Sequence, residues 1–158
     1  MKKLTVAVVF APVFVLLSAC TTSVEKAATT ECDAATAAKT TGQFQWPLKG
    51  NIVDNFTTLK AITIAGEKGK PVLSAADGDV VYVGNALKGY GNLIIISHDE
   101  VYRTAYGHND KILVKEGDKV KTGQQIATVG DTDAKQSLLH FEVRKDGHAV
   151  DPCLYLAK

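Results

Sequence analysis

The sequence predicts an all-β domain over residues 43–158, and three observations carry this prediction. From Asn51 onward, short runs rich in β-branched and aromatic residues alternate with turns that contain glycine. No window of this region shows the apolar period of about 3.6 residues that marks an amphipathic helix. Several runs instead alternate apolar and polar residues with a period of two, as half-buried strands do.

The first 19 residues are expected to be a signal peptide. Lys2 and Lys3 form a short positive region, and the apolar stretch Leu4–Leu17 that follows is too short for a typical membrane span. It ends in Leu17-Ser18-Ala19-Cys20, which resembles a bacterial lipobox. That resemblance implies cleavage before Cys20 and attachment of lipid to this cysteine; the alternative is a plain secretory signal with a chance cysteine.

A lipidated Cys20 would anchor the chain stably, since two or more acyl chains are enough for this. Thr21 follows, rather than the Asp that often retains such lipoproteins at the inner membrane, so we expect the outer membrane, facing the periplasm. Residues 20–42 are rich in Ala and Thr without clear periodicity, and are expected to tether the domain to the membrane.

The net charge and the cysteine content bear on possible partners and on disulfide formation. The formal net charge of +1 gives no reason to expect a nucleic-acid-binding surface. With Cys20 lipidated, Cys32 and Cys153 remain, and two cysteines in an oxidising compartment predict one disulfide. Two free thiols are the alternative. Neither cysteine has a partner ligand at zinc-finger spacing, so we expect no metal there.

The predicted domain opens with Phe44 and Trp46, which we expect to pack in the core or at a sheet edge. The runs Val80–Val83 and Leu93–Ile96 are almost continuously apolar, which indicates strands covered on both faces. Nine strands are predicted: Ile52–Phe56, Ala61–Ala65, Pro71–Ser74, Asp79–Gly84, Asn92–Ser97, Tyr102–Gly107, Lys111–Val114, Gln124–Val129 and Leu138–Arg144.

The last predicted strand sorts its side chains onto two faces by strict alternation. Leu139, Phe141 and Val143 should point into a core, whereas Leu138, His140 and Glu142 should point away from it. The stretch Leu59–Ile64 is expected to divide in the same way. Its inward residues are Ile62 and Ile64, and its outward residues are Leu59, Ala61 and Thr63. If the two outward faces line one groove, that groove holds a solitary histidine among apolar and hydroxyl side chains.

The chain resembles the LytM/lysostaphin family of zinc endopeptidases over about residues 46–156, with its motifs in family order. The resemblance implies an antiparallel β fold of the duplicated hybrid motif, or barrel-sandwich, type. Within the family, Gly84–Ile96 and Tyr106–Asp110 most resemble the NlpD-type lipoproteins, which activate peptidoglycan amidases. The motifs that carry the family resemblance are Ala75–Gly84, Gly89–Asn92, Thr104–His108, Val114–Gln124, Leu139–Arg144 and Val150–Pro152.

The same resemblance implies where a zinc site would lie. The family's peptidases bind zinc through H-x-x-x-D and the second histidine of H-x-H; here these positions hold Leu59, Thr63 and His140. Of two auxiliary histidine positions, one keeps His108 and the other is Leu138. A catalytic zinc needs about three protein ligands and an open position. We therefore expect no zinc, no other cofactor and no hydrolysis.

Other side chains could in principle replace the missing ligands, but none lies in a matching register. The available side chains are those of Asp54, Asp77, His98 and His148, and the two histidines are expected at the surface. For His108 and His140, a structural or vestigial role and a role in partner contact remain equal alternatives.

The resemblance implies a non-catalytic activator of a periplasmic zinc-dependent N-acetylmuramoyl-L-alanine amidase in cell division. Such amidases carry a helix that blocks their own zinc site, and a groove that binds the regulatory segment would favour the open enzyme. Apolar Leu59 and Leu138 would be buried by such a segment, unless shortened loops collapse over them. The predicted groove residues are Leu59, Thr63, Tyr90, His108, Leu138 and His140, with weaker arguments for Arg103 and Lys88.

Two alternatives remain open at this point. A module that binds peptidoglycan or organises the envelope would bind isolated sacculi without changing amidase rates. A residual zinc endopeptidase would bind zinc near stoichiometrically, which the missing ligands argue against.

Overall fold

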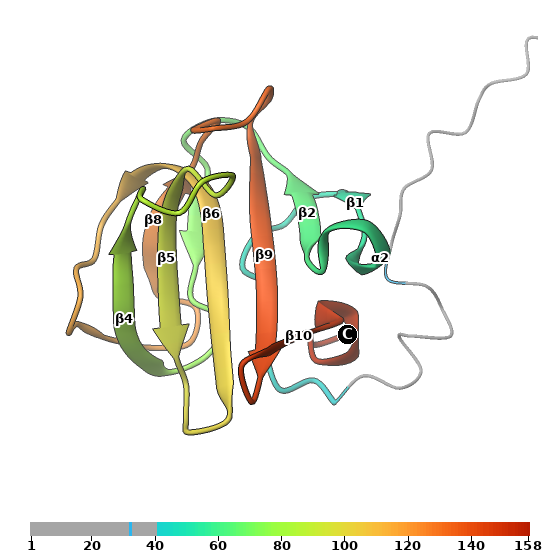
Figure 1. Ribbon diagram of the computed structural model, residues 1–158, viewed down its shortest axis with the longest axis vertical. Helices are drawn as coiled ribbons and strands as arrows, with labels where there is room; N and C mark the ends of the chain where they lie inside the picture. Colours follow the sequence, from blue (N-terminus) through green and yellow to red (C-terminus); the bar gives the residue numbers. More distant parts are fainter. Residues whose placement is uncertain (1–31, 33–40) are drawn as a thin grey trace, which may run out of the picture.

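One antiparallel sheet forms the body of the domain in the computed structural model, which describes Cys32 and residues 41–158 (Figure 1). Within this described part, ten strands run in the order β1-β2-β9-β6-β5-β4-β7, while β10 pairs with β9, and β8 pairs with both β3 and β6. Every pairing between these ten strands is antiparallel, so the predicted all-β class is confirmed. The strands are β1 (Ile52–Asp54), β2 (Ile62–Ala65), β3 (Pro71–Leu73), β4 (Gly78–Gly84), β5 (Asn92–Ser97), β6 (Tyr102–Ile112), β7 (Lys119–Val120), β8 (Gln125–Val129), β9 (Leu138–Lys145) and β10 (His148–Val150).

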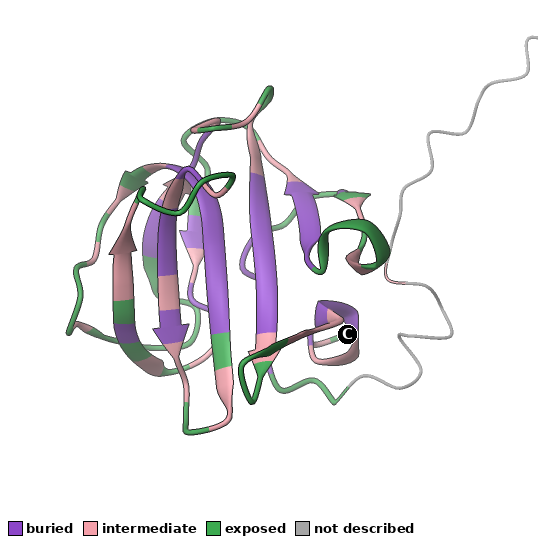
Figure 2. Ribbon diagram, viewed as in Figure 1, coloured by how far each residue is buried: buried purple, intermediate pink, exposed green. Residues whose placement is uncertain are grey.

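Strand β9 lies in the middle of the sheet, hydrogen-bonded to β2 on one side and β6 on the other. The predicted inward residues of β9, Leu139, Phe141 and Val143, are fully buried, and so are Ile62 and Ile64 of β2. Figure 2 shows the buried class running along most of β6 and β9. The period of two therefore identified the core face of both strands correctly.

The strand bounds differ from the prediction around residue 59. Phe56–Leu59 forms a short helix, α2, because the Asn55 side chain accepts a hydrogen bond from the Thr57 amide at its start. Lys60 then takes a left-handed backbone, with φ of 57°, and its amide closes the turn onto Phe56. The expected single strand from Leu59 to Ile64 is thus wrong in its first half, because a four-residue helix is too short to show periodicity.

Two further differences concern strand pairing. Lys111–Val114 was expected to be a separate strand, but β6 continues to Ile112 by pairing with β5, β8 and β9 along its length. Val81 was expected to be covered on both faces, yet it is 48% exposed. Its strand, β4, has only the two-residue β7 on its outer side and so lies close to the sheet edge. The short strands β7 and β10 were not predicted.

The N-terminal and C-terminal parts of the domain are joined to each other. A disulfide links Cys32 to Cys153, 121 residues apart, which is the pairing that the cysteine count predicted. Cys153 lies in the 3-10 helix η1 (Pro152–Leu154), and Phe44 forms a parallel bridge with Leu156. Phe44 is buried and Trp46 packs against the core, as expected.

The expected signal peptide (residues 1–19), Cys20 and nearly all of the tether (residues 20–42) lie outside the described residues. In the part of the chain that is described, no helix is long and apolar enough to cross a membrane.

Candidate functional site

The outer face of β9 carries the first two residues of the candidate site. His140 and Glu142 alternate with the core residues of this strand, so they point away from the core, yet they are only 9% and 3% exposed. His140 stands in register with Thr63 of β2 and with Gly107 of β6. The sheet thus brings Thr63, predicted from the second strand, directly beside His140.

A loop between β4 and β5 covers these side chains with Tyr90. Gly91 makes the loop possible: its φ is +59°, and a Cβ there would lie 2.2 Å from the carbonyl oxygen of Thr132. The Tyr90 ring meets the His140 ring edge-on, with centroids 5.1 Å apart. The Tyr90 hydroxyl donates to Oε1 of Glu142 at 2.7 Å. Burial raises the pKa of Tyr90 to about 12, and the Glu142 carboxylate adds to this effect.

The second histidine of the site is His108, in β6. Its ring centroid lies 5.9 Å from that of His140. Its Nδ1 is 2.8 Å from the Thr132 carbonyl oxygen; since a carbonyl only accepts, Nδ1 carries the proton. Burial lowers the pKa of His108, against the opposing effect of this hydrogen bond. The outward faces of β2 and β9 contribute one histidine, His140, and β6 adds His108, whose backbone is left-handed (φ 62°) and whose ring lies beside that of His140.

Glu142 is the centre of the hydrogen-bond network. Besides Tyr90, His140 approaches Oε1 through Nε2 at 3.0 Å, and Arg144 donates from Nη1 to Oε2 at 2.9 Å. Burial raises the pKa of the carboxyl, but hydrogen bonds from His140, Tyr90 and Arg144 outweigh it, so the pKa is lowered overall. The sequence prediction placed Glu142 on the outward face but did not name it as a site residue. No local pattern distinguishes Glu142 from the other outward residues of β9, because the contact that covers it comes from Tyr90, 52 residues away in the sequence. We call Thr63, Tyr90, His108, His140 and Glu142 the histidine site.

Two residues of the predicted groove, Leu59 and Leu138, are not part of the histidine site. Leu59 is in α2 and is 46% exposed, so it is not on the strand face that carries Thr63. The capped helix removes it from the β2 register. Leu138 shares the outward face of β9 with His140, but it is half-buried and bridges to Gly130. Neither of the two leucines has a lone pair to offer a metal.

Beside the histidine site lies a cavity of about 330 Å³, which we call the arginine pocket. Arg103 of β6 and Arg144 of β9 stand directly opposite each other across the two strands. Lys88, the other weakly predicted contact, is an exposed residue next to Leu87 in the loop. The pocket is lined by Leu87, Tyr90, Leu93, Ile95, Arg103, Ala105, Glu142, Arg144 and Gly147.

The donor set of the histidine site does not fit a catalytic zinc ion. Among the described residues, no group of three or more His, Cys, Asp or Glu side chains is arranged to hold a metal. His140 and His108 supply two imidazoles, whereas a catalytic zinc ion needs about three protein ligands. The remaining neighbour is the hydroxyl of Thr63, a poor zinc ligand unless deprotonated.

The histidines expected at the surface differ from each other. His148 is exposed, as predicted. His98 is half-buried rather than exposed: its Nδ1 lies 2.7 Å from the Asp77 carbonyl oxygen, and its Nε2 lies 2.7 Å from Oγ1 of Thr104. Burial lowers its pKa. His98 thus connects the β4 end to β6, which gives it a structural role.

The chain belongs to Peptidase family M23, whose pattern matches residues 57–152. Among solved structures, the catalytic domain of lysostaphin from Staphylococcus simulans is 32% identical, with a TM-score of 0.57 over 70% of this chain and 85% of that one. Csd3 of Helicobacter pylori is 28% identical, with a TM-score of 0.66 over 73% of this chain and 35% of that one. The expected LytM/lysostaphin-like fold is confirmed.

Among curated relatives, the murein hydrolase activator NlpD of Escherichia coli (strain K12) is 50% identical over 117 residues, which are 72% of this chain and 31% of that protein. Lipoprotein NlpD of Yersinia enterocolitica is 55% identical over 93 residues, which are 59% of this chain and 96% of that sequence. The chain thus spans about a third of the length of the Escherichia coli protein.

Proposed function

We propose that this chain is a non-catalytic lipoprotein that activates a periplasmic zinc-dependent N-acetylmuramoyl-L-alanine amidase during cell division and daughter-cell separation. The names of its relatives, murein hydrolase activator and lipoprotein, support this class of function. One observation carries the proposal: on the face that holds zinc in the family's peptidases, the described residues offer two histidines and Thr63 but no group of three metal-binding side chains. Such a face can bind a partner, but it lacks the ligands to activate a water molecule.

The arginine pocket supports a partner of defined chemistry. Most of its lining residues are apolar, Arg103 and Arg144 are paired in register across β6 and β9, and Glu142 is the only carboxylate of the lining. Glu142 pairs with Arg144, whereas Arg103 has no ion pair among the described residues. Two like charges directly opposite each other across strands are unfavourable, and an anion bound between them would relieve this repulsion. The pocket therefore suits a segment with apolar side chains and a carboxylate.

The proposed mechanism is a shift of the amidase between two states. The resemblance to the NlpD-type lipoproteins implies an enzyme whose own helix blocks its zinc site. Binding of that regulatory segment along the histidine site and arginine pocket would stabilise the open enzyme, because this surface has affinity for the released segment alone. Apolar area buried in this contact would contribute about 25 cal/mol per Å². Leu138 and Leu87 are the apolar residues that we expect to be covered.

The N-terminal residues would confine this activity to the envelope. A signal peptide over residues 1–19 and lipid on Cys20 would anchor the chain to the outer membrane, facing the periplasm. The names of several relatives, which include an outer membrane antigenic lipoprotein B, support the lipoprotein class.

Dye release from labelled sacculi tests the proposal. Candidate periplasmic amidases are assayed with and without the soluble chain that starts after Cys20, and with its Leu138→Glu and Arg103→Glu variants. We expect strong stimulation by the wild type and at least about a tenfold loss in each variant, since a charge is placed on, or reversed in, the contact. Leu113→Glu is the matched control, because Leu113 is equally apolar and 55% exposed but lies outside both lining sets.

Three results would contradict the proposal. If no amidase is stimulated, the activator role is wrong, and a wall-binding or scaffolding role replaces it. If the chain alone releases dye and a chelator stops this, the domain is a zinc peptidase. If Leu113→Glu fails as badly as Leu138→Glu, stimulation does not depend on the face of the histidine site.

A further inference from the structure

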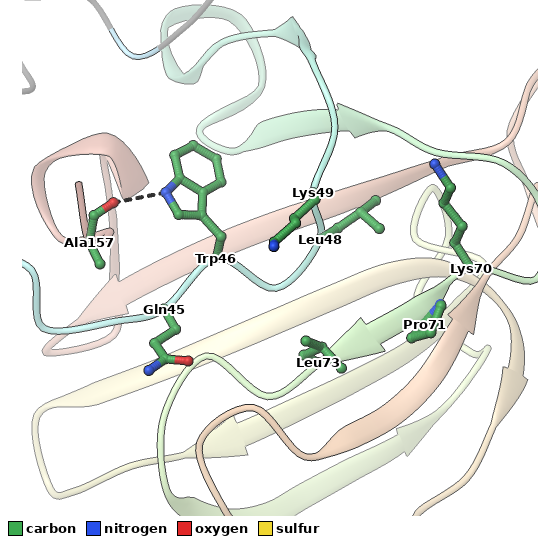
Figure 3. A pocket seen from close by; sticks show the side chains of 8 residues that line it. All are labelled: Gln45, Trp46, Leu48, Lys49, Lys70, Pro71, Leu73 and Ala157. Carbon is green, nitrogen blue, oxygen red and sulfur yellow. Dashed lines mark hydrogen bonds between the residues drawn. The ribbon is translucent and has the colours of Figure 1, made fainter.

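A second groove, of about 550 Å³, lies between the segment that precedes β1 and the strand β3 (Figure 3). We call it the tryptophan groove. It shares no lining residue with the histidine site or the arginine pocket, so the proposed function leaves it unexplained. Its lining residues are Gln45, Trp46, Leu48, Lys49, Lys70, Pro71, Leu73 and Ala157.

Hydrogen bonds between distant parts of the chain hold the walls of this groove in place. The Trp46 indole donates to the Ala157 carbonyl at 2.8 Å, as Figure 3 shows. The amide of Leu73 donates to the Pro47 carbonyl and that of Gln45 to the Ala75 carbonyl, both at 2.8 Å. The groove is therefore preformed, which reduces the entropy that a ligand loses in ordering it.

The lining combines an apolar floor with cations. Leu48 and the half-buried Trp46 and Leu73 form the floor, and Lys49 and Lys70 stand exposed beside it. Neither lysine takes part in an ion pair among the described residues, whereas nearby Lys68 is paired with Asp131. No carboxylate lines the groove. This charge pattern favours a ligand that has both an apolar surface and carboxylates.

We propose that the tryptophan groove binds peptidoglycan itself, through one sugar ring and the peptide attached to it. The apolar C–H face of a sugar ring can pack on the Trp46 indole, and alanine methyl groups can pack on Leu48 and Leu73. The carboxylates of the wall peptide would pair with Lys49 and Lys70. The volume of the groove falls in the range of about 300–1,000 Å³ that small-ligand sites occupy.

This inference rests on the proposed function only for the choice of ligand. A wall-binding groove separate from the amidase contact would hold the activator on its enzyme's substrate. Two weak contacts on one chain then raise the effective concentration of the bound amidase at the wall.

Intrinsic fluorescence offers a direct test, because Trp46 is the single tryptophan of the chain. The full-length protein, as the cell processes it, is purified in detergent and titrated with soluble muropeptides obtained by digestion of sacculi. We expect a saturable change in the Trp46 emission, and about a tenfold weaker affinity in a Lys49→Glu/Lys70→Glu variant. Added salt should weaken binding by the wild type.

A matched variant, Lys111→Glu/Lys135→Glu, changes the net charge equally at two exposed lysines outside the groove. Equal loss in both double variants, or no change in Trp46 emission, would overturn the proposal. A response to an acidic apolar peptide but not to muropeptides would overturn it in favour of a protein partner.

An amidase assay on solubilised peptidoglycan, run beside dye release from sacculi, separates this inference from the proposed function. Lys49→Glu/Lys70→Glu should leave stimulation of an amidase on solubilised peptidoglycan unchanged, since the groove lies apart from the arginine pocket. Muropeptide binding without stimulation of any amidase would leave the inference standing and remove the activator role. Stimulation without muropeptide binding would do the reverse.

Discussion

The substitution Glu142→Gln tests whether the buried carboxylate organises the histidine site. Glutamine keeps one oxygen for Tyr90 and His140, but its amide nitrogen then faces Nη1 of Arg144, so that a donor meets a donor. A hydrogen bond to a charged group contributes about 1.5–3 kcal/mol. The Arg144 side chain is 41% exposed, so water competes for it, and we expect a loss of about 1–2 kcal/mol in the free energy of unfolding.

The pH dependence of this loss follows from the lowered pKa of Glu142. A carboxyl whose pKa is lower in the folded state contributes stability above its unfolded value of 4.5. That contribution disappears as the pH falls through the folded-state pKa. The difference between wild type and Glu142→Gln should therefore be largest near neutral pH and shrink below pH 4.5.

Urea denaturation, with the free energy extrapolated to water, measures both quantities. Glu100→Gln is the control, because Glu100 is exposed and makes no hydrogen bond through its side chain among the described residues. Equal stability of Glu142→Gln and wild type at pH 7, or a difference that persists unchanged to pH 3, would refute the argument that the carboxylate is held ionised by its three donors.

The remaining predictions concern the disulfide and the metal. Cys153→Ser should lower the free energy of unfolding by at most about 5 kcal/mol, which is the chain-entropy value for a loop of 121 residues. Mild reductant should destabilise the wild type by the same amount. A variant as stable as the oxidised wild type would show that the bond constrains only the tail around Cys32. Dialysis against a chelator should leave the midpoint of thermal unfolding unchanged, since Thr63 and His140 do not complete a zinc site. Stoichiometric zinc by elemental analysis, or a fall in this midpoint after chelation, would contradict the prediction.

The sequence predicts some residues of the histidine site and misses others. Thr63, His108 and His140 were each identified from family positions, and the sheet does bring them together. Leu59 was misplaced, because the Asn55 cap and the left-handed Lys60 create a helix that no periodic pattern announces. The sequence predicts that Glu142 points away from the core, but it does not identify Glu142 as a site residue. The alternation of β9 cannot reveal which outward side chain will be covered.

Local patterns in the sequence determined the all-β class, the core face of β9 and the two cysteines available for a disulfide. These follow from the chain alone, because a period of two assigns faces without reference to any other strand. Tertiary structure alone decided which residues meet across the sheet. The Tyr90 hydroxyl reaches Glu142 across 52 residues of sequence, and Arg103 faces Arg144, because strand register and loop bends bring them together. Register depends on pairing between distant segments, and no local pattern encodes it completely.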